Sequence, residues 1–324
     1  MRAILAAKYG NPDVLGIQEV AKPSPKDNEV LIRVKATVTA NADCVFRKGK
    51  PFLSRIFTGL SRPRQIPGDV FSGVIEATGK AVTSFKAGDE VYGSSGTAMG
   101  TNAEYVALPE EGAIAIKPGN VTHEQAAAIS EGALTALPFL RDNGRIKKGH
   151  KVLVNGAAGG VGVSAVQLAK YFGAEVTAVC GPQNLKLVRS LGADKAIDYT
   201  KMDYTASGEQ YDIIFDAVGK SSFTRCKKAL AAEGIYLTTV PSIGIMAGML
   251  FSSSGKKAVF AATGLRKPSA KRQDLSLLNT LIEAGQLNAV IGKTFELENM
   301  ADAHRYVETG HKIGNAVVTV RDIG

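Results

Sequence analysis

The stretch VLVNGAAGGVGVSAVQLAKYFG, residues 152–173, decides the fold. A short apolar run is followed by four glycines within seven residues, and the chain then resumes with the apolar spacing of a helix. Gly156, Gly159 and Gly162 keep a spacing of three between strand and helix. In a strand–turn–helix unit the first such glycine permits the tight turn, the second lets a pyrophosphate approach the backbone, and the third lets helix and strand pack closely. Because the helix N-terminus offers free N–H groups to phosphate oxygens, the stretch predicts a dinucleotide-binding turn.

The chain around this turn alternates between helix-length stretches and apolar strands, starting near residue 126. The strands are expected at residues 151–156, 175–180, 195–199, 211–219, 234–240 and 258–263. Such alternation indicates a parallel, doubly wound α/β sheet.

The part before residue 126 has a different pattern, with short strands separated by Gly, Pro and Asp. A helix is expected near residues 275–285, after which residues 315–322 return to strand character and are expected to rejoin the first part. We therefore predict one domain from residues 1–125 with 286–324, and a second from residues 126–285.

Composition bounds the function. The 324 residues are 45% hydrophobic, which suffices for a large core. The net charge of +9 comes from scattered basic residues and aromatics are only 6%, so we expect a small-molecule substrate and no nucleic acid. Cys44, Cys180 and Cys226 lie far apart, which fits a reducing cytoplasm. We expect no stable membrane insertion, and Gly244 and Gly248 predict a buried loop or subunit contact at residues 241–257 rather than a regular helix.

Several motifs together resemble one known family. The turn GAAGGVG at 156–162 occurs with PGDVFSGVIEATGKAVTSFKAGDEVYG at 67–93, YDIIFDAVG at 211–219 and AHRYVETGHKIGNAVVTV at 303–320, in the same order as in that family. The chain resembles the medium-chain dehydrogenase/reductase superfamily, in its zinc-free quinone oxidoreductase branch. The resemblance implies a GroES-like β-barrel domain, a Rossmann domain, a cleft between them, and a homodimer.

The resemblance also implies which residues bind the cofactor. They come from the glycine turn, from the ends of the Rossmann strands and from the two motifs that flank them. The expected cofactor-binding residues are Thr135, Gly156, Ala158, Gly159, Gly160, Val161, Gly162, Gly181, Gln183, Asn184, Tyr199, Val218, Gly219, Val240, Pro241 and Asn315.

The choice between NADPH and NADH depends on the end of the second Rossmann strand. A site that prefers NAD places Asp or Glu there, on the ribose hydroxyls. Residues 176–187 contain no acid, which favours NADPH, with Gln183, Asn184 and Tyr199 as donors to its phosphate. Relatives often have a Ser and a basic residue where this chain has Gly181 and Gln183, so NADH stays the alternative.

A zinc site is not expected. Catalytic zinc takes three N, S or O ligands and keeps one open position. The His-Glu place of zinc dehydrogenases reads Gly68-Asp69, the first-domain Cys place falls on Ala40, and the region of Leu134 has no Cys. Cys44 comes one turn too late, and the four histidines have no mutual ligand spacing.

The catalytic candidates are Asn41 and Phe46. Many zinc-free relatives have an Asn at the place of Ala40, and here Asn41 stands one position later and can donate a neutral hydrogen bond to an acceptor oxygen. Phe46 offers an apolar face to the substrate, and Asp43 is expected to orient loop backbone rather than act as an acid. The second proton is left to solvent or to a cofactor hydroxyl. Val240 and Pro241 are expected to border the nicotinamide.

These residues favour a zinc-independent, NADPH-dependent oxidoreductase that transfers hydride to a quinone or an α,β-unsaturated carbonyl. Conjugated acceptors of this kind accept hydride without a Lewis acid. Two alternatives stay open: a zinc-free alcohol/aldehyde oxidoreductase, and a non-catalytic NADPH-binding structural or regulatory protein.

Overall fold

The computed structural model describes residues 1–63, 65–250 and 255–321. The chain divides into two compact units, Met1–Glu131 with Gly264–Gly324, and Gly132–Thr263. Helix α3 (His123–Pro138) passes from one into the other. Residues 264–285 belong to the first unit by their contacts, whereas the predicted domain limits place them in the second. The domain limits stay a prediction.

The second unit is built on one six-stranded sheet in which all neighbours are parallel. Its order is β10-β9-β8-β11-β12-β13, so the chain starts in the middle, winds outward and then returns to wind the other way. This is the strand order of a Rossmann sheet, whose ligands bind where the winding reverses, here between β8 and β11. The strands are β8 (Lys151–Asn155), β9 (Glu175–Cys180), β10 (Lys195–Asp198), β11 (Tyr211–Asp216), β12 (Leu230–Thr238) and β13 (Lys257–Phe260). The predicted α/β fold is confirmed.

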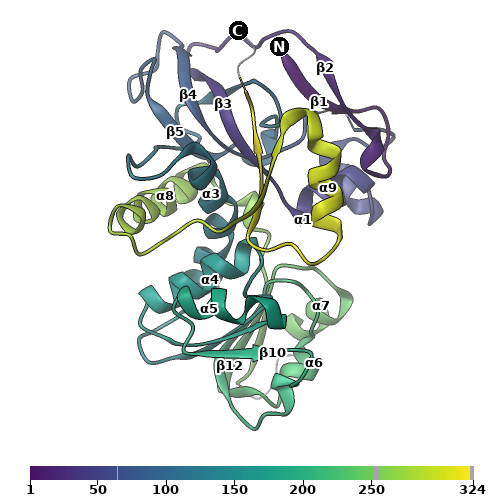
Figure 1. The fold of residues 1–324 in the computed structure, drawn as a ribbon, viewed down its shortest axis with the longest axis vertical. Coiled ribbons are helices and arrows are strands. Elements are labelled where there is room, and N and C mark those ends of the chain that lie inside the picture. Colours follow the sequence, from purple (N-terminus) through teal and green to yellow (C-terminus); the bar gives the residue numbers. More distant parts are fainter. Residues whose placement is uncertain (64, 251–254, 322–324) are drawn as a thin grey trace. The chain divides into compact units, whose positions relative to one another are not determined.

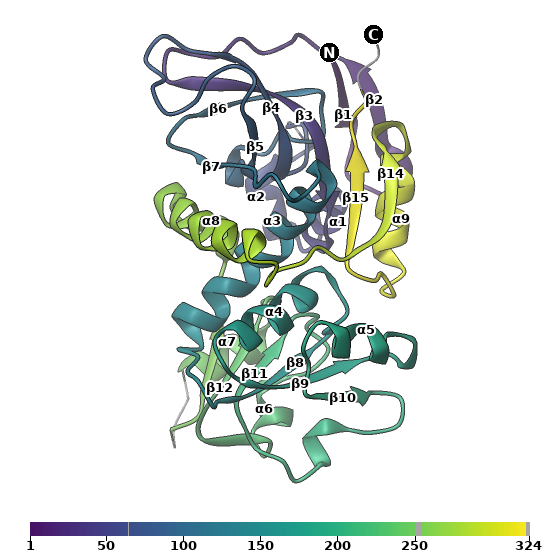
Figure 2. The same ribbon diagram turned by 60° about the vertical axis from the view of Figure 1, so that its left-hand side comes forward.

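Helices connect these strands and cover them. Helix α4 (Gly160–Tyr171) packs on β8 and β9, and α5 (Leu185–Ser190) packs on β10 (Figure 2). Helix α6 (Phe223–Cys226) contacts β12, and α7 (Ile243–Leu250) contacts β13. The central strands β8, β9 and β11 are almost continuously buried, as a sheet covered by helices requires, whereas the edge strands β10 and β13 are mostly half-buried.

The prediction of an irregular buried loop at 241–257 is wrong for its first half. Residues Ile243–Leu250 form α7 despite Gly244 and Gly248, because glycine costs a helix only about 1 kcal/mol and does not forbid it. At Gly248 a Cβ would lie 3.1 Å from Cβ of Ala258, so this glycine lets α7 approach β13. Met246 and Met249 are exposed on the same helix. Residues 251–254 of this stretch lie outside the described residues.

The first unit is built on a seven-stranded sheet of order β14-β15-β3-β4-β5-β7, with β6 also paired to β3, and a separate β1-β2 pair (Figure 1 and Figure 2). Its C-terminal strands lie beside a strand from the N-terminal part, because β15 pairs with both β14 and β3. The strands are β1 (Arg2–Ala6), β2 (Leu15–Glu19), β3 (Glu29–Thr39), β4 (Val70–Thr78), β5 (Glu90–Ser94), β6 (Tyr105–Pro109), β7 (Ala113–Ile116), β14 (Ile291–Glu296) and β15 (Asn315–Thr319).

Four further helices complete the first unit. Helix α1 (Asn41–Lys48) packs against α9 (Met300–Glu308), which itself lies along β14 and β15. Helix α8 (Pro268–Glu283) packs on β7, and the short α2 (Arg55–Thr58) follows a single turn at Phe52–Ser54. Among the helices of the described residues, none has the length and apolar character needed to cross a membrane.

Candidate functional site

The turn between β8 and α4 has the geometry that the glycine spacing predicts. Gly156 has a φ of +78°, in the left-handed region that favours glycine. The N–H groups of Gly156 and Ala157 both donate to the carbonyl of Val179, at 3.1 and 3.0 Å, which ties the turn to the end of β9. Gly159 then donates to the carbonyl of Gly156 at 3.0 Å and caps the helix.

The three glycines differ in the space around them. A Cβ on Gly156 would lie 2.3 Å from Cγ1 of Val218, and one on Gly162 would lie 2.1 Å from the carbonyl oxygen of Gly156. A Cβ on Gly159 would meet only that same oxygen, at 3.5 Å. The first and third glycines are therefore closely packed by the protein, whereas the second faces open space where a bound group can approach the backbone.

The N-terminus of α4 supplies donors to that space. Val163 is the first residue to donate back into the turn, to the carbonyl of Gly159 at 2.9 Å. The N–H groups of Gly160, Val161 and Gly162 precede the first intrahelical hydrogen bond and are free for a ligand. No side chain caps the helix, and its first turn carries no acid, so the positive end of the helix dipole is not neutralised locally.

Helix α3 lies against the same helix start. A Cβ on Gly132 would lie 2.4 Å from the carbonyl oxygen of Gly160, so α3 and α4 approach as closely as backbones allow. Thr135 follows about one turn later on α3 and is half-buried. Ala158 is buried in the turn itself.

The carboxyl end of β11 is held by a buried aspartate that sequence reasoning missed. Asp216 accepts hydrogen bonds from Nδ2 of Asn155 at 3.0 Å and from the hydroxyl of Tyr236 at 2.9 Å. It also accepts from the N–H groups of Gly219 at 3.0 Å and Ser221 at 2.9 Å. One carboxylate thus fixes the loop after β11 to β8 and β12. An acid ending an otherwise apolar strand, FDAVG, is the signal that could have identified it.

This loop carries two predicted cofactor residues, Val218 and Gly219. Gly219 has a φ of +65°, and a Cβ there would lie 2.6 Å from Cγ2 of Val240. The structure therefore brings Gly219 and Val240 together at the carboxyl ends of β11 and β12. Pro241 follows directly and is exposed.

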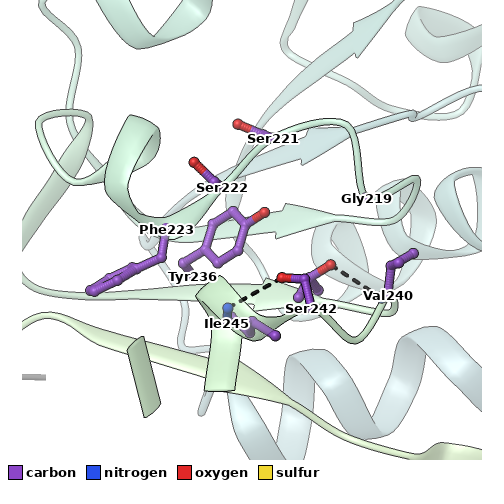
Figure 3. Close-up of a pocket in the computed structure, with 9 residues that line it drawn as sticks. Gly219, Ser221, Ser222, Phe223, Tyr236, Val240, Ser242 and Ile245 are labelled. Atoms are coloured by element: carbon purple, nitrogen blue, oxygen red, sulfur yellow. Dashed lines mark hydrogen bonds between the residues drawn. The ribbon is translucent and has the colours of Figure 1, made fainter. Parts of the chain in front are cut away.

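A pocket of about 90 Å³ opens beside these residues (Figure 3). Hydroxyl groups dominate its polar lining, and they are already engaged locally: Oγ of Ser242 accepts from the N–H of Ile245, and Oγ1 of Thr238 accepts from the N–H of Val240, both at 3.2 Å. The lining residues are Gly219, Ser221, Ser222, Phe223, Tyr236, Thr238, Val240, Ser242 and Ile245.

The loop after β9 is expected to bind the adenosine part of the cofactor. Asn184 is buried and its N–H donates to the carbonyl of Gly181 at 3.0 Å, while Gln183 is exposed. Tyr199 is exposed after β10, and its N–H donates to the carbonyl of Cys180 at 3.3 Å, so the two strand ends are joined.

Asp198, at the end of β10, is an acid close to the end of β9 that lies outside residues 176–187. Its carboxylate accepts from the N–H and hydroxyl of Thr200 at 2.9 and 2.7 Å, and these bonds lower its pKa. Burial, and then the charge of Asp198, raise the pKa of the Cys180 thiol to about 11. The absence of acid from residues 176–187 thus does not make the surroundings free of negative charge.

In the first unit, α1 carries the two catalytic candidates. Asn41 is its first residue and is exposed, while Phe46 is half-buried. Oδ2 of Asp43 accepts from the N–H of Ala40 at 2.7 Å, so the prediction that Asp43 orients loop backbone is confirmed. Phe46 and Asp43 line a small cavity of about 30 Å³ together with Pro67 and Met99.

Asp43 is also one of three carboxyl groups with raised pKa values in this unit. Burial, followed by the charges of Asp69 and Glu131, raises the pKa of Asp43 to about 7, and the N–H of Ala40 and the charge of Lys312 oppose this. Burial likewise raises the pKa of Asp69, against the positive charge of Lys271, and the pKa of Glu131, against that of Lys312. Burial therefore disfavours the ionised form of all three carboxyl groups.

Asn315 also lies in the first unit, at the start of β15. It is 1% exposed, and its Nδ2 donates to the carbonyl of Val290 at 3.4 Å. Its Oδ1 has no hydrogen-bond partner within the part of the chain that the structure describes. The predicted site residues thus fall into two sets, one in each unit, and their meeting at a common cleft stays a prediction.

A cysteine–histidine pair exists where the sequence showed no ligand spacing. Sγ of Cys44 lies 3.4 Å from Nδ1 of His304, with both residues buried. Burial raises the pKa of the thiol to about 12 and lowers that of the imidazole to about 3, so both are neutral. Among the described residues, no group of three or more His, Cys, Asp or Glu side chains is placed to hold a metal ion.

Comparison with known proteins identifies the family. Residues 26–118 match the family described as Alcohol dehydrogenase GroES-like domain, and residues 191–318 match Zinc-binding dehydrogenase. A chloroplastic NADPH-dependent alkenal/one oxidoreductase of Arabidopsis thaliana is 34% identical over 98% of this chain and 79% of its own length. The chain belongs to the medium-chain dehydrogenase/reductase superfamily.

Two solved structures show how closely the chain follows this superfamily. The quinone oxidoreductase of Coxiella burnetii has a TM-score of 0.89 at 29% identity and covers 99% of both chains. The quinone oxidoreductase of Escherichia coli complexed with NADPH has a TM-score of 0.86 at 25% identity, covering 98% of this chain and 100% of that one. The predicted medium-chain dehydrogenase/reductase fold, with GroES-like and Rossmann parts, is confirmed over the whole length.

The raised pKa of Asp43 gives a prediction for stability. An unfolded aspartate titrates near 3.9, so the native state holds this proton more tightly and the resulting stabilisation is complete below about pH 4 and lost as pH rises through about 7. Asp43→Asn keeps an acceptor for the Ala40 N–H but cannot ionise. Its free energy of unfolding relative to the parent should rise between about pH 4 and 8, by on the order of a few kcal/mol. Denaturant titrations of both proteins across this range provide the measurement, and parallel pH profiles would contradict it.

Proposed function

We propose that this protein is a zinc-independent, NADPH-dependent oxidoreductase that transfers hydride to a quinone or an α,β-unsaturated carbonyl. The observation that carries the proposal is the open backbone at Gly159, directly in front of the uncapped start of α4. The similar proteins support the same cofactor and acceptors. They include an NADPH-dependent alkenal/one oxidoreductase, a quinone oxidoreductase, and a quinone oxidoreductase solved in complex with NADPH.

The chain has suitable groups for each part of the cofactor. The N–H groups of Gly160 and Val161 would donate to the pyrophosphate, and the exposed Gln183 and Tyr199 would donate to the adenosine phosphate. Val218 and Val240 would border the nicotinamide with apolar contacts. When bound, NADPH supplies the hydride that reduces the acceptor.

The acceptor side is proposed to lie at the start of α1. Asn41 would donate a neutral hydrogen bond to the acceptor oxygen, on which negative charge grows as hydride arrives. Phe46 would give the acceptor a flat apolar face without a proton. The N–H of Ala40 donates to the carboxylate of Asp43, and Asn41 is exposed and available for this role.

The finer parts of the proposal are the preference for NADPH, the independence from zinc, the homodimer and the cytoplasmic location. Gly68-Asp69 and Ala40 stand where a zinc dehydrogenase of this superfamily has its ligands, which supports zinc independence. A carboxylate is absent from residues 176–187, which supports NADPH.

The test of function is NADPH consumption with a panel of quinones, enals and saturated aldehydes. Quinones or enals should be turned over, saturated aldehydes should not, and prior dialysis against a strong chelator should leave the rate unchanged. Turnover of aldehydes alone would support the alcohol/aldehyde alternative. Tight NADPH binding without turnover of any acceptor would indicate a regulatory protein.

The pair Gly159 and Gly162 gives a matched prediction for the cofactor turn. Gly159→Val adds its side chain in open space, so the fold should survive while NADPH affinity falls by about a hundredfold through lost pyrophosphate contacts. Gly162→Ala places a Cβ against backbone and should instead cost about 1–3 kcal/mol of folding stability. Calorimetric titration and thermal melts on both variants measure the two effects. Unchanged affinity in Gly159→Val would place the pyrophosphate elsewhere.

Gly181→Asp tests the adenosine side. The new Cβ would lie 3.0 Å from the flexible end of Gln183, which can move, so the fold should tolerate the change. A carboxylate there would repel the 2′-phosphate of NADPH and accept from the ribose hydroxyls of NADH. The ratio of NADPH to NADH affinity should fall roughly tenfold or more. An unchanged ratio would remove this loop from the phosphate site.

Asn41→Ala tests the acceptor side. If Asn41 donates to the acceptor oxygen, turnover should drop by roughly ten- to a thousandfold while NADPH affinity stays nearly unchanged. Turnover is to be measured per folded molecule, with the thermal melt recorded on the same sample. Normal turnover per folded molecule would mean that backbone, water or cofactor holds the oxygen.

A further inference from the structure

The surface segment around α2 exposes large apolar side chains and buries small polar ones. Phe52, Ile56 and Leu60 recur every fourth residue from the turn before α2 to just beyond it, and their side chains are 64%, 64% and 62% exposed. Ser54 and Thr58, which alternate with them, are both only 8% exposed. A helix of a globular protein normally buries its large apolar residues and exposes its small polar ones. Among the side chains that the structure describes in this segment, the row of three large apolar ones is in contact with solvent and the two small polar ones are buried.

The inward face of this segment is fixed to the rest of its unit. The hydroxyl of Tyr9 bonds Oγ1 of Thr58 at 2.8 Å and also the carbonyl of Gly59. The guanidinium of Arg55 stacks 4.4 Å from the centre of the Tyr9 ring, and its Nε donates to the carbonyl of Gly49 at 3.1 Å. The outward direction of Phe52, Ile56 and Leu60 is therefore set by the contacts on the opposite side.

Within the sequence of the segment, every charged residue is basic. Residues 48–62, KGKPFLSRIFTGLSR, contain Lys48, Lys50, Arg55 and Arg62, and no Asp or Glu occurs anywhere from residue 44 to residue 68. Lys50 and Arg62 are exposed, while Lys48 pairs with Glu308 at 3.0 Å. The whole chain carries a formal charge of +9. A complementary partner would offer apolar groups to the exposed row and anionic groups to the basic residues beside it.

We propose that residues 48–62 form a reversible docking site for a membrane surface that contains anionic lipids. The lipid headgroup layer has the required chemistry, because exposed Phe, Ile and Leu enter the boundary of the acyl chains while Lys and Arg meet the phosphates. A short interfacial segment of this kind binds peripherally. It is consistent with the lack of a membrane-crossing helix in the described chain, and the proposal does not depend on the function argued above.

The experiment is co-sedimentation of the full chain with vesicles of phosphatidylcholine alone and of phosphatidylcholine mixed with phosphatidylglycerol. The parent protein should bind the anionic vesicles at low salt and lose binding as salt rises. The triple variant Phe52→Ser/Ile56→Ser/Leu60→Ser and the charge variant Lys50→Glu/Arg62→Glu should each partition roughly tenfold less. The matched control Leu265→Ser/Lys80→Glu, which changes an exposed apolar and an exposed basic residue of the same unit, should bind as the parent does.

A second readout places the contact. The chain contains no tryptophan, so Phe52→Trp introduces a single reporter whose emission should shift to the blue on anionic vesicles, whereas Leu265→Trp should not respond. Equal binding to neutral and anionic vesicles, or normal binding by the triple variant, would overturn the proposal. A smaller oligomer in the triple variant, measured by analytical ultracentrifugation, would overturn it as well, because the row would then be an interface between copies of the chain.

Discussion

The carbonyl oxygen of Gly156 occupies the place where a side chain on Gly162 would begin, 2.1 Å from the ideal Cβ position. Because Gly162 has no side chain, the first turn of α4 can pack directly against the backbone of the turn that follows β8. The free N–H groups of Gly160 and Val161 are thereby held at the carboxyl edge of the sheet, where the strand order reverses. The candidate cofactor site depends on this one backbone contact.

A second constraint holds the neighbouring loop in place. Asp216 is fully buried, and its oxygens accept from a side chain of β8, a side chain of β12 and the backbone of its own loop. A buried carboxylate that accepts this many hydrogen bonds has its acceptor capacity satisfied. Removing any one donor would leave the carboxylate less firmly positioned, and the remaining hydrogen bonds would weaken. The positions of Val218 and Gly219, and through them of Val240, follow from this network. Three residues that donate to Asp216, namely Gly219, Ser221 and Tyr236, also line the pocket shown in Figure 3.

The sequence predicts well those features that depend on local periodicity and on glycine. The six Rossmann strands and the turn at Gly156 were predicted because apolar runs and left-handed glycines have few alternative structures. The acid at the end of its apolar strand marks Asp216 locally, but its partners Asn155 and Tyr236 lie far away in the chain. The pairing of Cys44 with His304 is likewise long-range, so no local pattern shows these contacts. Helix α7 was missed because its two glycines signal a break locally, whereas packing against Ala258 favours the helix. Asp198 was overlooked because it ends β10, whereas the acid that distinguishes NADH from NADPH is expected at the end of the neighbouring strand β9.

The most direct measurement is a crystal structure of the protein grown with NADPH. We expect pyrophosphate oxygens within hydrogen-bond distance of the N–H groups of Gly160 and Val161, with the backbone of Gly159 in van der Waals contact with the cofactor. NADPH bound elsewhere, with the face of Gly159 left to solvent, would contradict it.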